Sequence, residues 1–142
     1  MEQWKRAILQ GNSDFEARQY HLAFRHYRRA LMLARHHYAS WPVADQAVAA
    51  LVIAHHNLAE LLVRMDHVDD AADNLCAAHD QLLATMADDA LPMALREAAS
   101  CHSKATLCEL SRFAREYGSH PRVMRTMSRS CDLCDPRTRT LH

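Results

Sequence analysis

The chain has 142 residues, of which 49% are hydrophobic and 24% charged, with equal numbers of basic and acidic side chains. This length and composition are those of one globular domain with a core of its own. Only 2 glycines and 4 prolines occur, which argues against a loop-rich or all-β fold, and the absence of any run of about 18 uncharged apolar residues argues against a membrane span.

The cysteines and the first residues of the chain favour a cytoplasmic location. There are 5 cysteines, an odd number, and three of them lie inside helical patterns, so they do not form a disulfide framework. Residues 1–5 contain no apolar signal core, so we expect no export signal.

Charge is spread unevenly along the chain. Residues 1–40 carry 7 Lys or Arg against 3 Asp or Glu, residues 41–90 carry 1 against 9, and residues 91–142 carry 9 against 5. A uniform nucleic-acid footprint would not have this basic, acidic, basic order. Complementary faces within one molecule or between two copies would produce it, and so would ordinary solvated helix faces.

Apolar residues recur at spacings of three and four along most of the chain, which predicts an all-α fold. The predicted helices cover residues 2–16, 20–38, 43–65, 68–86, 91–117 and, more briefly, 121–130. The loops between them are short, so consecutive helices should pack antiparallel as helix-turn-helix hairpins. We expect one helical domain over residues 1–118, and a short helix with an Arg-rich tail over 119–142 that caps the domain or is partly flexible.

The first predicted hairpin has a pattern of small and aromatic residues. Gly11 stands where its two helices cross, Tyr20 opens the second helix, and Ala23, Tyr27 and Ala30 follow at helical spacing. Small residues let two helices approach, and large ones fill the groove beside them. This segment resembles a tetratricopeptide repeat.

A second copy of the pattern follows 48 residues later, with Ala71 in the place of Ala23. Ala59, Leu75 and Ala78 take the other roles, and the offset exceeds the family's usual period of about 34 residues. A weaker third copy of the first helix begins near Ala98. The resemblance covers residues 3–117 and implies a right-handed superhelix of five to six lengthened helices that acts as a non-enzymatic adaptor for a protein or peptide.

The resemblance also implies where a partner would bind, since such domains grip peptides on a concave face lined by their first helices. The residues expected there are Lys5, Asn12, Phe15, Glu16, His56, Asn57, Glu60, Val63 and Arg64. Asn12 and Asn57 match asparagine positions of the family's carboxylate clamp, but Ile8 stands at its lysine position, so a terminal carboxylate is not the expected ligand. Asn57 could instead form a hydrogen bond between helices.

Enzymatic activity is not expected. The chain has no Gly-rich phosphate loop, no Gly-x-Ser-x-Gly elbow and no His-Glu-x-x-His motif. No constellation pairs a nucleophile with a base.

Histidine is unusually frequent, with 11 in the chain. Folding the predicted helices against one another places several histidines and cysteines in one layer: His26, His55 or His56, Cys76, His79, Cys101 and His102. Because Cys76 and His79 share a helix face, a structural zinc held by His56, Cys76, His79, Cys101 and His102 is one hypothesis. The alternatives are small core cysteines with satisfied or surface histidines, or a pH-sensitive histidine, and the leading expectation is no cofactor.

The C-terminal segment contains a single Cys-x-x-Cys, formed by Cys131 and Cys134. Zinc ribbons need two such pairs or added histidines, so this motif would need His120, His142 or a second copy of the chain to complete a site. The alternative is a simple helix-ending tail.

Two further surfaces follow from the charge pattern. Residues 18–37 form a basic helix with Arg18, Arg25, Arg28, Arg29, Arg35, His26 and His36, and arginines recur in the tail at 122, 125, 129, 137 and 139. They suggest nucleic-acid binding as a less favoured alternative, because arginine spacing alone is weak evidence. The acidic residues Asp66, Asp69, Asp70, Asp73 and Asp80 could instead join the basic helix of a second copy in a homodimer.

Overall fold

The computed structural model describes residues 1–134, and the side chains of residues 1–130. It confirms the predicted all-α fold of helix hairpins. The helices are α1 (Glu2–Glu16), α2 (Tyr20–His36), α3 (Ala44–Arg64), α4 (Val68–Ala87), α5 (Met93–Tyr117) and α6 (Pro121–Cys134). Their bounds lie within two residues of the prediction, except that α6 continues four residues beyond the predicted end.

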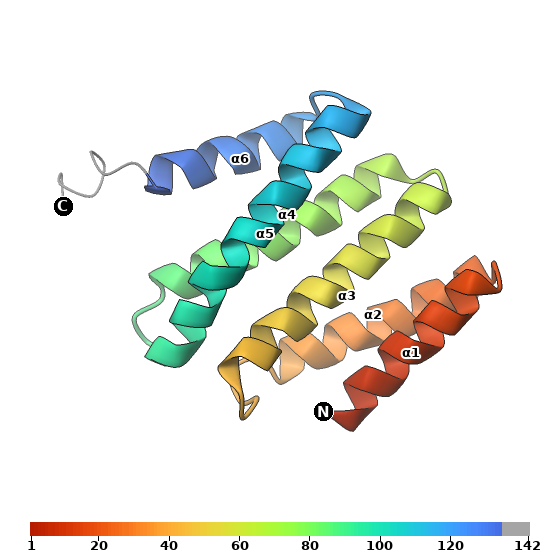
Figure 1. The fold of residues 1–142 in the computed structure, drawn as a ribbon, viewed down its shortest axis with the longest axis horizontal. Coiled ribbons are helices and arrows are strands. Elements are labelled where there is room, and N and C mark those ends of the chain that lie inside the picture. The colour runs from red at the N-terminus through yellow and green to blue at the C-terminus, as the bar shows by residue number, and fades with distance from the viewer. Residues whose placement is uncertain (135–142) are drawn as a thin grey trace.

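The helices follow one another in a zigzag, with α1, α3 and α5 in front of α2 and α4 in Figure 1. Each helix packs on the next one in the chain, and α3 also packs on α5. The last helix, α6, lies against both α4 and α5. The hairpin of α1 and α2 is therefore the edge of the stack, while α3 lies at its centre.

The core consists of two clusters that share α3. The first joins α1, α2 and most of α3 with the start of α5, and alanines such as Ala23, Ala30 and Ala34 are fully buried where the helices cross. The second joins the last part of α3 with α4, α5 and α6, around Leu110 and Val123. Since α3, α4 and α5 contribute to both clusters, these three helices hold the two ends of the molecule together.

The position of α3 explains its composition. Among the described helices it is the one with the length and apolar character to cross a membrane. However, 61% of its most apolar window is buried inside the protein. Packing against α2, α4 and α5 therefore accounts for its apolar residues.

The turns after α1 and α3 are the same structure, 48 residues apart. Arg18 and Asp66 both have left-handed backbones, with φ of 61° and 64°. In the first turn the amides of Arg18 and Gln19 donate to the carbonyls of Phe15 and Asp14, and the amides of residues 66 and 67 repeat these bonds to residues 63 and 62. The sequence repeat is therefore also a repeat of hairpin geometry.

Candidate binding groove between α3 and α5

A groove of about 490 Å³ opens between the C-terminal halves of α3 and α5, with the start of α4 as its floor. At their other ends the two helices are close: His102 on α5 hydrogen-bonds Asp45 on α3 at 2.8 Å, and small residues such as Ala98 and Ala99 are buried there. Larger side chains, including Phe113, line the open end. The two helices are thus close where small residues lie between them, and they separate where the side chains are larger.

The α3 wall of the groove contains most of the second-repeat residues expected at a binding surface. They are His56, Asn57, Glu60, Val63 and Arg64. Asn57 makes no hydrogen bond to another helix within residues 1–130, so its amide is free to meet a ligand.

The predicted residues of α1 lie elsewhere. Phe15 approaches the groove only through the Arg64 guanidinium, which lies 5.6 Å from its ring centre. Asn12 accepts a hydrogen bond from the Tyr27 hydroxyl at 2.6 Å and so serves the α1–α2 hairpin. Lys5 and Glu16 are exposed and do not line the groove.

The opposite wall comes from α5 and was missed in the sequence. Glu109, Arg112, Phe113, Glu116 and Tyr117 supply it. Phe113 is buried and its ring lies 4.8 Å from that of Tyr117, which gives the wall an aromatic surface. The available signal was the weak third copy of the repeat, which begins near Ala98. If this copy is followed to the end of its helix, α5 is the first helix of a repeat, as α3 is, and should also line the binding surface.

Charges of both signs surround the groove. Arg112 pairs with Glu109 at 3.1 Å on the same helix. The carboxylates of Glu60 and Glu116 line the groove without an ion pair in the described part of the chain. Arg64 also lines the groove outside any ion pair of residues 1–130, so two carboxylates stand against one guanidinium and the groove has a small excess of negative charge.

His56 adds a polar group at the base of the α3 wall. Its Nε2 atom is buried and has no hydrogen-bond partner among the described residues. Burial lowers the pKa of His56, against the opposing effect of the nearby Glu109 carboxylate, so the ring is neutral at pH 7. A neutral imidazole can donate at one nitrogen and accept at the other, which suits a ligand with both kinds of group.

The predicted histidine–cysteine layer is not assembled as a metal site. Within residues 1–130, no group of three or more His, Cys, Asp or Glu side chains is placed to hold a metal ion. His56 lines the groove, His102 faces Asp45 at the far end of α3, and Cys101 is exposed. The side chains of Cys131 and Cys134 lie outside the described residues, so a zinc site in the tail stays a prediction.

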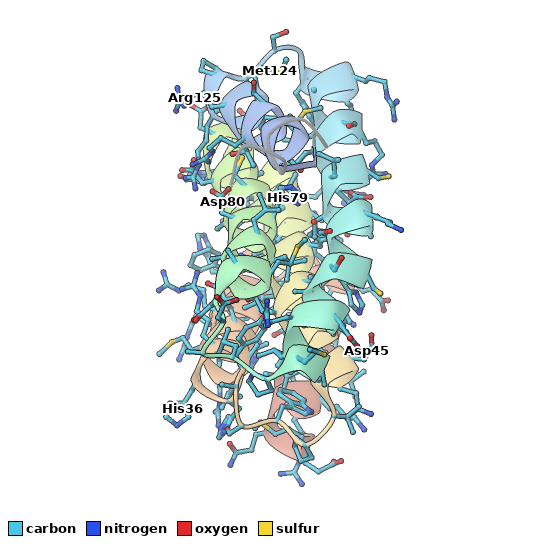
Figure 2. The ribbon with its side chains drawn as sticks, turned by 90° about the vertical axis from the view of Figure 1, so that its left-hand side faces the viewer. His36, Asp45, His79, Asp80, Met124 and Arg125 are labelled. Carbon is cyan, nitrogen blue, oxygen red and sulfur yellow. The ribbon has the colours of Figure 1, made fainter. Side chains whose placement is uncertain are left out.

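His79 occupies a different buried site, below α6 (Figure 2). Its Nδ1 lies 2.6 Å from Thr106 Oγ1 and its Nε2 lies 3.0 Å from Ser130 Oγ. The Thr106 hydroxyl donates to the Ser103 carbonyl, so it accepts from Nδ1, and Ser130 donates to Nε2. Burial lowers the pKa of His79, consistent with this neutral ring, and leaves neither nitrogen for a metal.

The predicted register of α4 and α5 was therefore wrong. His79 contacts Thr106 rather than His102, and Thr106 lies four residues, about one helical turn, after His102 on α5. Part of this offset arises because α5 begins at Met93 and not at residue 91. Cys76, the other predicted ligand of α4, is buried, and Thr126 of α6 is close enough to lower the pKa of its thiol, against the larger effect of burial.

The remaining two histidines of the layer have local partners. His55 Nδ1 lies 3.1 Å from Asn74 Oδ1 on α4, and His26 lies 3.8 Å from a carboxylate oxygen of Asp14 on α1. These are contacts within hairpins or between neighbouring helices, and they do not bring the two rings together.

Much of the acidic face of α4 is paired within the molecule by α6. His120 pairs with Asp69 at 3.1 Å, Arg122 with Asp73 at 3.1 Å, and Arg129 with Asp80 at 3.2 Å. The acidic and second basic segments of the sequence are thus complementary faces of one chain. Three of the five aspartates proposed for a homodimer contact are already engaged in this way.

Fold and groove together define an all-α protein of stacked helix hairpins in which a groove opens at the junction of α3, α4 and α5. The chain belongs to the family described as "Protein of unknown function (DUF2753)", whose family model matches residues 2–141. The matched region takes in all six helices, so α6 is part of the family's common unit. No curated protein and no solved structure matches the chain.

Proposed function

We propose that this protein is a non-enzymatic adaptor that binds an extended peptide segment of a partner protein in the groove between α3 and α5. The observation that carries the proposal is the combination of apolar walls with polar groups that have no partner in the described chain. Val63, Leu75 and Phe113 supply the apolar surface, and the His56 ring and the Asn57 amide supply the polar atoms.

An extended peptide has the chemistry that these groups recognise. Its backbone presents alternating donors and acceptors, which the Asn57 amide and the His56 ring can both satisfy. An apolar side chain of the peptide would rest on Phe113, and a basic side chain beside it would meet Glu60 or Glu116. The resemblance of Asn57 to a peptide-contacting asparagine of tetratricopeptide domains agrees with this role.

The composition of the groove also supports a binding role over catalysis. No Ser, Thr, Cys or Lys side chain lines it, so His56 has no nucleophile to activate there. The nearby carboxylate of Glu109 is engaged by Arg112.

Selection of displayed random peptides on the purified full chain tests the proposal. Peptides recovered would be synthesised, labelled and titrated by fluorescence anisotropy against Asn57→Ala, Val63→Glu and the exposed control Gln81→Ala. We expect Asn57→Ala to weaken binding about tenfold, since a peptide polar group loses its partner, and Val63→Glu to weaken it further. Equal binding of the peptides by all four proteins would place their site elsewhere and end the proposal.

A further inference from the structure

A second concave surface lies on α1 and α2, at the edge of the stack. This basic groove has a volume of about 750 Å³ and is separate from the groove between α3 and α5. The lining residues that carry the argument are Gln3, Arg6, Leu9, Arg25, His26 and Arg29.

Helical periodicity explains why these side chains gather outside the core. On α2, Ala23, Tyr27 and Ala30 are buried, so residues on the opposite stripe point outward. Arg25 and Arg29 lie on that stripe at a spacing of four, one turn apart. No later hairpin covers it, because α1 and α2 are the first in the stack.

The basic groove carries unbalanced positive charge. Arg6, Arg25 and Arg29 line it, and no Asp or Glu does. Within residues 1–130 none of these arginines forms an ion pair, although the arginines of α6 at 122 and 129 do. Two carboxylates lie close by: Asp14 is beside His26, and Glu2 is one helical turn before Arg6 on α1.

Large apolar side chains are exposed on the same two helices, and one of them, Leu9, lines the groove. Leu9 on α1 is 67% exposed, and Leu22 and Met32 on α2 are 42% and 63% exposed. Leu22 and Met32 fall on the same helical stripe as Arg25 and Arg29. Exposed apolar side chains gathered with unpaired charge are typical of a protein interaction surface.

We propose that the basic groove docks an acidic amphipathic helix of a partner protein. A helix about 10 Å wide fits the furrow between two packed helices, and α1 offers a length of about 22 Å, or four turns. Carboxylates of the docked helix would pair with Arg6, Arg25 and Arg29, and its apolar residues would cover Leu9 and Met32.

The surface fits other basic-site ligands less well. A nucleic acid would use the arginines but gain little from exposed leucine and methionine, and among the described residues no Phe, Tyr or Trp ring lines the groove for base stacking. An anionic membrane is best met by a protruding amphipathic surface, whereas these arginines line a concavity.

A designed peptide tests the docking. The probe is a labelled helix with Leu at positions i, i+3 and i+7 and Glu between them, and its control has the same composition in scrambled order. We expect the full chain to bind the first peptide more tightly than the second, and less tightly as salt rises. Arg25→Glu with Arg29→Glu should weaken binding tenfold or more.

Two further protein variants and one charge-reversed probe give the test its specificity. Lys104→Glu with Arg115→Glu makes the same change in net charge on α5 and should leave binding unchanged. A probe with Lys in place of Glu should bind the Arg25→Glu, Arg29→Glu variant better than it binds the wild type. Val63→Glu, in the other groove, should bind the acidic probe normally, so the two proposals can fail separately.

Several outcomes would overturn the docking proposal. They are equal affinity for the ordered and scrambled probes, equal loss of binding in the α5 charge variant, and tighter binding of a single-stranded oligonucleotide or of phosphatidylserine vesicles than of the acidic helix. Self-association of the wild type that is abolished by Arg25→Glu with Arg29→Glu would make a second copy the occupant instead. Circular dichroism would establish that each variant is folded.

Discussion

Gly11 and Tyr27 set how closely α1 crosses α2. Gly11 is buried, and a Cβ atom at this position would overlap the Tyr27 ring. Burial, followed by the nearby carboxylates of Glu60, Glu16 and Asp14, raises the pKa of Tyr27 to about 12. Tyr27 therefore keeps its proton and donates it to Asn12.

Replacing Gly11 with alanine should destabilise the protein, although alanine is the better helix former by about 1 kcal/mol. The overlap with a buried ring should cost about 1–3 kcal/mol, as overpacking does elsewhere. Urea unfolding of Gly11→Ala, beside the exposed control Ser13→Ala, measures the difference. A more stable Gly11→Ala protein would mean that the hairpin accommodates the methyl group without strain.

Buried histidine makes stability depend on pH. His55 is 2% exposed, and burial lowers its pKa from about 6.5 to about 4, against the hydrogen bond to Asn74. The unfolded chain takes up a proton below pH 6.5 that the folded chain resists. The stabilisation is therefore complete above pH 6.5 and falls by about 3 kcal/mol as the pH drops to 4. His56 and His79, whose pKa values burial also lowers, act in the same direction.

Urea unfolding of the wild type and His55→Gln between pH 7 and pH 4 checks this expectation. The glutamine variant has lost one titrating group, so its stability should decline less steeply, whatever its stability at pH 7. His21→Gln, at an exposed position, should keep the wild-type slope. Parallel slopes for all three proteins would show that His55 does not resist protonation.

At the scale of helices, the local sequence pattern predicted where each helix begins and ends. It did not predict which residues face one another across two helices. The apolar periodicity is a local signal, and it gave helix bounds close to those observed. The contact of His79 with Thr106 depends on turn length and on side-chain volume across two helices, which no local pattern contains. The groove shows the same contrast. The sequence repeat predicted the residues of its α3 wall, but it was too weak in α5 to predict those of the opposite wall.

The helix α6 covers a polar part of the core. Its own Val123, Thr126 and Ser130 are buried, and they face Cys76 and His79 of α4. Burial raises the pKa of the Cys76 thiol, so both burial and charge state protect it from alkylation.

Iodoacetamide labelling followed by peptide mass spectrometry should therefore separate the cysteines of α5 from Cys76. Cys101 and Cys108 are exposed and should react readily, while Cys76 should react slowly. Val123→Asp places a charge in the contact between α6 and α4 and should speed labelling of Cys76 about tenfold or more. Met124→Asp, on the exposed side of α6, is the control, and equal rates in the two variants would show that α6 does not protect Cys76.

At the scale of the whole molecule, ion pairs within the chain explain part of the basic, acidic, basic order of its segments. The ion pairs of α6 with α4 hold the third segment on the second, while the arginines of the first segment stay outside such pairs. At the α6 end of the stack the charges are thus paired with one another, whereas the α1–α2 end presents its arginines on the surface.

The two core clusters give the stack a graded stability, and α3, which supplies buried residues along most of its length, links them together with α4 and α5. Amide hydrogen exchange should be slowest in the middle of α3 and faster in α6, which packs at the edge. Val123→Asp should speed exchange in α6 and the facing part of α4 and leave α1 and α2 unchanged. Val48→Ala, a cavity in α3, should cost about 2 kcal/mol and speed the slowest amides of every helix by about 30-fold. If Val123→Asp speeds exchange in α1 and α2 as much as in α6, the stack opens as one unit and the separation into two clusters has no energetic consequence.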